Sequence, residues 1–282
     1  MIRHISLVIK QRAELPKKIA NILAKKLTSQ GIQITEGSVD PNSDAIIVLG
    51  GDGTLLHVAG QAHHLSIPLL GINLGGLGFL TEITLEEIDQ AVDSLLKGDF
   101  TLDKRMMISV SIYRKDSKVD ELLGLNEAVL TKGPFGRIIT LPTWADSKFV
   151  NAYRGDGLII STPTGSTAYN MSAGGPIIHP NIEALVLTPI CPFALGSRPL
   201  ILHGESCIEI EVEPVDQEEI SLIIDGQIFR VLEPKDKVKI KKASGQLQLV
   251  KSPTRDYFTI LREKLGWASD PAFNTETSPK NH

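Results

Sequence analysis

Apolar residues in the first hundred positions alternate between short continuous runs and helical spacing. Continuous runs at residues 4–9, 45–49 and 68–72 each predict a strand that is covered on both faces, as in a parallel sheet. Between these runs, residues 14–27 carry apolar side chains at helical spacing, and residues 55–65 also favour a helix. Strands that alternate with helices in this way predict an α/β domain that is doubly wound and Rossmann-like.

A capping box begins one further helix. Thr84 and Glu87 stand three residues apart, so that the hydroxyl of the first and the carboxylate of the second can each accept from an amide that the helix leaves unpaired. The helix is expected to run through Leu96, and Gly98 is expected to end it. This helix completes the first domain, which we place at residues 1–100.

From about residue 101 the apolar residues recur at every second position instead. Ile108, Val110 and Ile112 alternate with polar residues, and the same period appears at residues 208–212 and 237–241. A period of two predicts strands with one solvated face. Because turn residues such as Asp225-Gly226 separate these segments, we expect a mostly β, sandwich-like domain over residues 101–252.

The end of the chain shows two further patterns. Tyr257, Leu261 and Leu265 recur every four residues and predict a short helix within residues 253–267. We expect this helix to return to the first domain. The remaining residues, 268–282, are polar and contain proline, so we expect them to be disordered.

Composition and charge narrow the function classes. The chain has 282 residues and a formal net charge of −4, which argues against a generally basic nucleic-acid binder and against a polybasic membrane binder. No apolar run reaches the ~18 residues of a membrane-spanning helix. We therefore expect a cytoplasmic protein without nucleic-acid or membrane partners. Cys191 and Cys207 are expected as buried thiols, and His63-His64 as a surface pair.

The strongest local motif is Gly50-Gly51-Asp52-Gly53-Thr54, which lies between a predicted buried strand and a helix. Glycines let a backbone approach phosphate closely, and the following helix N-terminus offers free amides to anions. The lysine of a Walker A loop is missing. Asp52 fits two roles in such a loop, holding Mg²⁺ or accepting a proton from an attacking hydroxyl, and the plain alternative is a helix cap.

Three further segments are candidates for binding. Residues 161–170 follow a predicted strand and place hydroxyls, an amide and Tyr169 around Gly165, a composition suited to sugars, phosphates and a flat base. Asn126-Glu127 can bind an adenine edge or a ribose diol. Residues 73–79 are rich in glycine and follow a strand, so they should lie on the same sheet edge as the Gly50–Thr54 loop.

Taken together, these motifs resemble the bacterial NAD kinases. The resemblance rests on GGDGT at 50–54, NLGGLGFL at 73–80, NE at 126–127, RGDGLIISTPTGSTAYNMSAGGPIIHP at 154–180, LTPICP at 187–192, RPL at 198–200 and FTILREKLGW at 258–267. It therefore covers about residues 1–267. GGDGT alone is shared with diacylglycerol and sphingoid-base kinases, whereas GDGLIISTPTGSTAYN is much more specific.

The resemblance implies an enzyme that transfers the terminal phosphate of ATP to the 2′-hydroxyl of the adenosine ribose of NAD, giving NADP. It implies Asp52 as the proton acceptor, Mg²⁺ as the accompanying metal with no ligands assigned, and a homo-oligomer, dimer or tetramer, built through the β domain. The implied phosphate loop consists of Gly50, Gly51, Gly53 and Thr54. The implied NAD-binding residues are Asp52, Gly53, His57, Phe79, Asn126, Glu127, Arg137, Arg154, Asp156, Thr167, Ala168, Tyr169, Asn170, Met171, Ser172 and Gln227.

Two alternatives and one departure remain. A lipid kinase of the same superfamily would act on a sphingoid base or a diacylglycerol, and a catalytically silent dinucleotide sensor would bind without turnover. Where members of the family commonly carry a histidine after LTPICP, this chain has Phe193.

Overall fold

The computed structural model describes residues 2–10, 14–133, 136–213 and 219–267, which form two compact units. The first unit contains the described residues up to Leu55, those from Ile67 to Asp103, and those from Leu249 onward. The second contains Leu56–Ser66 and Lys104–Gln248. The tail expected to be disordered, 268–282, lies outside the described residues.

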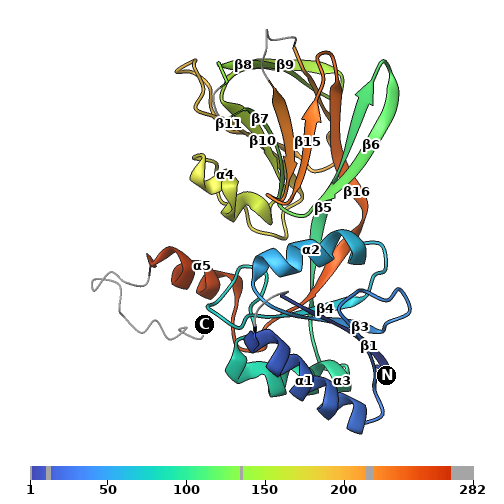
Figure 1. The fold of residues 1–282 in the computed structure, drawn as a ribbon. Helices are drawn as coiled ribbons and strands as arrows, with labels where there is room; N and C mark the ends of the chain where they lie inside the picture. Colours follow the sequence, from blue (N-terminus) through green and yellow to red (C-terminus); the bar gives the residue numbers. More distant parts are fainter. Residues whose placement is uncertain (1, 11–13, 134–135, 214–218, 268–282) are drawn as a thin grey trace. The chain divides into compact units, whose positions relative to one another are not determined.

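The first unit is built on parallel strands (Figure 1). Their order is β2-β1-β3-β4, with β1 at His4–Ile9, β2 at Gln33–Glu36, β3 at Ala45–Leu49 and β4 at Pro68–Ile72. The continuous apolar runs become the buried strands β1, β3 and β4, as the sequence pattern predicts. The edge strand β2 is short and is not buried.

Helices cover both faces of this sheet. Helices α1 (Glu14–Ser29) and α3 (Ile88–Lys97) pack on one face, where Leu23 and Val92 share a core with Ile47. On the other face, a β-carbon added at Gly71 would come 2.9 Å from the Leu55 side chain, in the first turn of α2 (Asp52–Ala62). The doubly wound α/β expectation is therefore confirmed.

Local chemistry sets the helix ends. The capping box is confirmed, because the Thr84 amide donates to Glu87 over 2.9 Å, although its first turn is a 3₁₀ helix at Leu85–Glu87. Gly98 ends α3 in the left-handed conformation, with φ of 75°. Helix α2 lies three residues earlier than the predicted 55–65, since the amides of Thr54 and Leu55 already donate to the carbonyl of Gly51.

The closing helix of the described chain is α5 (Tyr257–Leu265). The Asp256 carboxylate accepts from the amide of Thr259, and Gly266 follows with φ of 68°. Near its start, Arg255 forms an ion pair of 2.6 Å with Glu87 in the same unit. The predicted helix is thus present, and it belongs to the first unit.

The second unit contains two β-sheets. One is antiparallel, in the order β12-β11-β10-β7-β14-β15 (Leu200–His203, Ala184–Ile190, Gly157–Ser161, Glu127–Lys132, Ile220–Ile224, Ile228–Leu232). The other contains β16-β13-β8-β9 (Lys237–Val250, Ile208–Glu211, Ile139–Ala145, Lys148–Gly155), with β5 (Leu102–Arg114) pairing β16 and β6 (Ser117–Gly124). Short helical turns, η2 (Gly165–Thr167) and α4 (Tyr169–Ser172), follow β10.

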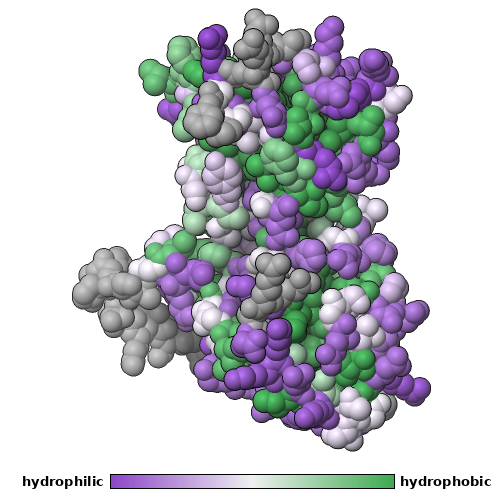
Figure 2. All heavy atoms as spheres, viewed as in Figure 1, coloured by the Kyte–Doolittle hydropathy of each residue, from purple (hydrophilic) through white to green (hydrophobic). Residues whose placement is uncertain are grey.

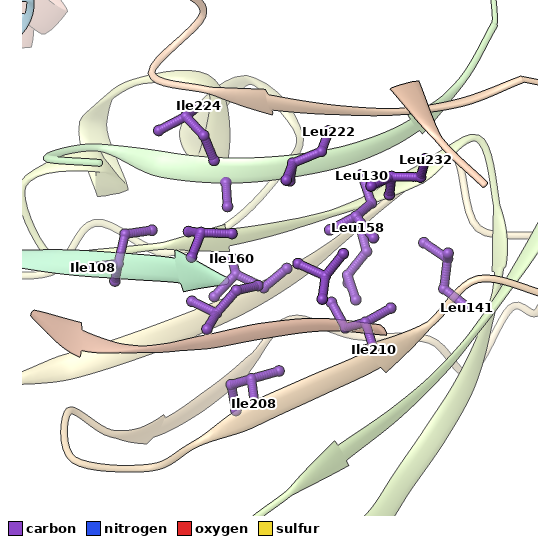
Figure 3. Packing of buried hydrophobic residues seen from close by; sticks show 14 of the residues in the cluster. Ile108, Leu130, Leu141, Leu158, Ile160, Ile208, Ile210, Leu222, Ile224 and Leu232 are labelled. Atoms are coloured by element: carbon purple, nitrogen blue, oxygen red, sulfur yellow. The ribbon is translucent and has the colours of Figure 1, made fainter. Parts of the chain in front are cut away.

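Side chains from both sheets fill one core. Leu158, Ile160 and Leu222 of the first sheet pack with Ile208 and Ile210 of the second, and all are fully buried (Figure 3). The alternation that the sequence shows therefore corresponds to a sandwich, with every second residue directed inward. This rigid core holds the strand ends that carry the candidate binding residues.

Two expectations about single side chains are wrong. Cys191 is exposed, because it occupies a turn with φ of 43° just after β11 rather than a core position. His63 is buried, and its Nδ1 atom lies 3.1 Å from the carbonyl of Gly60. Hydrophilic side chains cover much of the surface visible in Figure 2, with apolar residues in small groups between them. No helix in the described ranges is long and apolar enough to cross a membrane.

Candidate functional site

The Gly50–Thr54 loop lies at the carboxyl end of β3, next to the end of β4. The amide of Gly50 donates to the carbonyl of Ile72 over 2.9 Å, which ties the loop to the end of β4. A β-carbon at Gly50 would overlap the Thr54 side chain, so this position admits only glycine. Residues 73–81, which follow β4, contact Asp52, and the expectation that both loops share one sheet edge is confirmed.

The carboxylate of Asp52 is held by the second loop. Its Oδ2 atom accepts from the amide of Phe79 over 2.9 Å. Its Oδ1 atom accepts from the amides of Leu80 and Thr81, at 3.1 and 3.0 Å, and from the Thr81 hydroxyl at 2.9 Å. Asp52 is the first residue of α2, but among the residues that the structure describes its carboxylate accepts from Phe79, Leu80 and Thr81. Its carboxylate therefore joins two loops instead of serving as a plain helix cap.

The two oxygens of Asp52 differ in what they can still accept. A carboxylate offers about four lone-pair sites, two on each oxygen. Three donors already surround Oδ1, whereas Oδ2 has one. Oδ2 is therefore the atom with capacity for a further hydrogen bond, such as one from a substrate hydroxyl.

The neighbours of Asp52 in the loops differ in exposure. Gly53 is exposed, whereas Gly51, Thr54 and Phe79 are half-buried. The ring centroid of Phe79 lies 5.8 Å from the Lys264 ammonium. The loop thus presents backbone and a hydroxyl at a helix N-terminus, an arrangement that suits an anionic phosphate.

A second group of predicted residues meets in the second unit, where the carbonyl of Asn126 joins two segments. The amide of Thr162 donates to this carbonyl over 2.8 Å, and a β-carbon at Gly165 would overlap it. The Thr162 hydroxyl in turn donates to the carbonyl of Leu125 over 2.6 Å. The loop that follows β10 is therefore packed directly on the start of β7.

Asp225, which directly follows β14, also holds Asn126-Glu127 in place. Its carboxylate accepts from the amides of Leu125, Asn126 and Glu127, at 2.7, 2.8 and 3.0 Å. It occupies the turn between β14 and β15, with φ of 51°, and Gly226 and the exposed Gln227 follow it. The ends of three neighbouring strands thus converge on Asn126-Glu127.

Glu127 is the most unusual acid of this region. Its side chain is 5% exposed, and within the described ranges its buried Oε2 atom has no hydrogen-bond partner. Burial, together with the nearby charge of Asp225, raises the pKa of Glu127 to about 8. The side chain is therefore mainly protonated at neutral pH and offers a hydroxyl as a hydrogen-bond donor.

The loop 167–172 divides into exposed and buried side chains. Tyr169 is 46% exposed and Ser172 is exposed, whereas Thr167, Ala168 and Met171 are half-buried. Asn170 is fully buried: its amide donates to the carbonyls of Ser166 and Pro176, and its oxygen accepts from Thr188 over 2.6 Å. Asn170 therefore fixes the shape of the loop, and Tyr169 is its exposed flat face.

Four other predicted residues lie outside these contacts. His57 is exposed on α2, and Arg137 is exposed before β8. The Arg154 guanidinium stacks on the ring of Phe193, 4.9 Å from its centroid. Asp156 forms an ion pair of 3.0 Å with Lys132.

Sequence reasoning missed two residues that shape these groups. Thr81 holds the Asp52 carboxylate through its amide and hydroxyl, and Asp225 anchors Asn126-Glu127. The position of Thr81 directly after the glycine-rich loop was a usable indication. The sequence pattern indicates Asp225 only as a turn residue, because 98 to 100 residues separate it from the amides that it binds.

Among the residues that the structure describes, no three or more His, Cys, Asp or Glu side chains lie together as a metal-binding group. The side chains near Asp52 therefore do not form a cage for Mg²⁺, an ion that usually keeps water and substrate phosphates as ligands.

Comparisons with known proteins agree with this architecture. The family model of the ATP-NAD kinase N-terminal domain matches residues 7–100, and that of the C-terminal domain matches residues 125–252. An NAD kinase of Syntrophotalea carbinolica is 48% identical over 82% of this chain and 81% of the relative. One of Syntrophobacter fumaroxidans is 43% identical over 94% of this chain and 99% of the relative.

Two solved structures share the fold. Yeast NADH kinase complexed with NADH has a TM-score of 0.85 at 24% identity, and the match covers 99% of this chain and 90% of that one. An NAD kinase from Archaeoglobus fulgidus in complex with ATP has a TM-score of 0.75 at 25% identity, covering 93% and 97%.

Proposed function

This chain belongs to the ATP-NAD kinase family of phosphotransferases, and we propose that it converts NAD and ATP into NADP and ADP, with Asp52 as the proton acceptor. The acceptor atom is the 2′-hydroxyl oxygen of the adenosine ribose. The observation that carries the proposal is the Asp52 carboxylate, fixed at the start of α2 with capacity left on Oδ2.

The reaction is written as a direct transfer. The ribose 2′-oxygen attacks the γ-phosphorus of ATP and forms the new P–O bond, while its proton passes to Oδ2 of Asp52. The bond from the γ-phosphorus to the β–γ bridging oxygen breaks, and ADP leaves with that electron pair. Such transfers depend mostly on positioning and on charge stabilisation, which a fixed carboxylate and a rigid loop provide.

The phosphates of ATP are assigned to the Gly50–Thr54 loop. Its glycines admit close approach, and the first amides of α2 lie beside it, where a helix N-terminus favours negative charge. Mg²⁺ is treated as part of the donor, MgATP, because the described side chains form no cage for it.

The dinucleotide is assigned to the second group, around Asn126-Glu127, and Gly53, His57 and Phe79 stay predicted contacts. The protonated Glu127 would donate to a ribose or carboxamide oxygen, and Asn126 would accept from or donate to the adenosine. Tyr169 offers a flat face on which a base can stack. Arg137, Arg154, Asp156, Gln227 and the loop residues Thr167, Ala168, Met171 and Ser172 stay predicted contacts. Asn170 contributes by holding the loop in shape.

We also propose a homo-oligomer that forms through the β domain. The edge strand β15 exposes Phe229 and Val231, which lie two residues apart on one face, while Leu232 points into the core. Exposed apolar side chains in a row on an edge strand favour pairing with another chain. The expected cytoplasmic location stays a prediction.

One assay distinguishes an NAD kinase from a silent dinucleotide sensor and from a lipid kinase. The purified chain is mixed with NAD, ATP and MgCl₂, and NADP is measured with an NADP-specific dehydrogenase. We expect NADP to form in proportion to protein. Binding of NAD without NADP would favour a silent sensor, and phosphate transfer to sphingosine or diacylglycerol in vesicles, without NADP, would favour a lipid kinase.

A further inference from the structure

A directed chain of hydrogen bonds leads from Asn73 to Asp52. The side-chain oxygen of Asn73 accepts from the amide of Gly75 over 3.0 Å, which fixes the orientation of the Asn73 amide. Its nitrogen then donates to the Thr81 hydroxyl oxygen over 2.8 Å. Because that oxygen receives a proton from Asn73, the Thr81 hydroxyl directs its own proton to Oδ1 of Asp52, 2.9 Å away.

The surroundings of this chain leave little room for rearrangement. Thr81 has no solvent exposure, and its amide and hydroxyl both donate to the same carboxylate oxygen. A β-carbon at Gly78 would overlap both Oδ1 of Asp52 and the Thr81 hydroxyl. The Gly78 amide also donates to the carbonyl of Thr81 over 3.2 Å. The carboxylate therefore lies between a glycine backbone and a buried hydroxyl.

We propose that Thr81, oriented by Asn73, is a positioning residue that fixes Asp52 with its Oδ2 atom toward the substrate hydroxyl. The inference rests on the proposed function, since it requires Asp52 to accept the proton. Three donors stabilise negative charge on Oδ1 and prevent rotation of the carboxylate, so the proton is received by Oδ2. Thr81 itself does not touch substrate.

The first test removes the hydroxyl and keeps the shape. Thr81→Val should lower kcat by about tenfold, the size expected for one lost hydrogen bond to a charged group, and should leave KM for NAD and for ATP within about twofold. Thr81→Ser keeps the hydroxyl and should restore kcat to within about threefold of wild type. A purely structural role of the side chain would predict the reverse, because serine loses the buried methyl group.

The second test asks whether Thr81 acts through Asp52. In an Asp52→Asn background, Thr81→Val should lower kcat by less than about twofold, whereas independent roles would give the full tenfold loss. If Asp52→Asn is inactive and Thr81→Val is not impaired, the positioning role is overturned and the proposed function stands. If Asp52→Asn keeps full turnover, the proposed function itself fails.

A variant at the half-buried Asn73 covers the case in which Thr81→Val does not fold. Asn73→Ala removes the donor that orients the hydroxyl, together with the acceptor of the Gly75 amide, so kcat should fall by about threefold with both KM values unchanged. The exposed Gly196, with no atom within 4 Å of an added β-carbon and outside the segments assigned to substrate, gives the control Gly196→Ala. Equal kcat for Asn73→Ala, the control and wild type would overturn the inference.

Discussion

Gly165 lies directly against the backbone of Asn126, so that a β-carbon at position 165 would overlap the Asn126 carbonyl oxygen. That carbonyl also accepts from the amide of Thr162. Gly165→Ala must therefore push the loop away from the start of β7, at a cost of about 1–3 kcal/mol in the free energy of unfolding. Urea denaturation measures this loss, and KM for NAD should rise in parallel.

The control for this variant lies in the same unit. Gly196 is exposed, and an added β-carbon there would have no atom within 4 Å, so Gly196→Ala should stay within about 0.5 kcal/mol of wild type. Equal stability of the two alanine variants would show that the close approach of Gly165 to Asn126 is not required.

Glu127 should make stability depend on pH. Burial and Asp225 raise its pKa from the usual 4.5 to about 8, so between these values the folded chain keeps a proton that the unfolded chain releases. The free energy of unfolding must then decrease as pH rises through this window. Glu127→Gln removes the titration and should reduce the decrease between pH 5 and pH 8 by about 3–4 kcal/mol.

Urea denaturation of wild type and Glu127→Gln at pH 5, 6, 7 and 8 measures this effect. Asp225, whose pKa is also raised by burial, is present in both proteins and cancels in the comparison. Parallel stability curves for the two proteins would mean that Glu127 is ionised when folded. The glutamine amide should also keep NAD binding at pH 7, because it can donate where the neutral acid donates.

Tyr169 should affect one substrate more than the other. Its ring is 46% exposed at the end of a loop that the buried Asn170 holds in place. Tyr169→Ala removes a stacking face worth about 1–1.5 kcal/mol, so KM for NAD should rise about tenfold while KM for ATP changes less than about twofold. Initial rates with each substrate varied in turn decide this, and an equal rise in both KM values would place Tyr169 outside the dinucleotide site.

The sequence was sufficient where local chemistry determines structure. Residues 45–49 form a strand with the predicted bounds, because an unbroken apolar run lies between Asp44 and Gly50-Gly51. Thr84, Glu87 and Gly98 set the ends of a helix through contacts within a few residues. The alternation of apolar and polar residues in the second half predicts sheets packed face to face, and its apolar residues lie in the core of the second unit. The continuous apolar runs of the first half lie in the core of the first unit.

The sequence was insufficient where a side chain contacts a segment far away along the chain. The contacts of Asp52 with residues 79–81 span 27 to 29 positions, so its role as a link between loops depends on the folded sheet edge. Asn170 was a candidate for ligand contact, yet its amide is buried against Ser166, Pro176 and Thr188. Residue type alone does not distinguish a binding amide from one that holds a loop.

Asp52→Asn tests the central claim most directly. The asparagine oxygen can still accept at the Oδ1 position. Its NH₂ group would replace Oδ2, where it loses the hydrogen bond from the Phe79 amide and cannot take a proton from the ribose. We measure NADP formation at saturating NAD and MgATP, together with NAD binding by calorimetry and the unfolding midpoint. The account predicts a loss of kcat of about 10²-fold or more, with NAD binding and folding retained. Turnover close to wild type would contradict it.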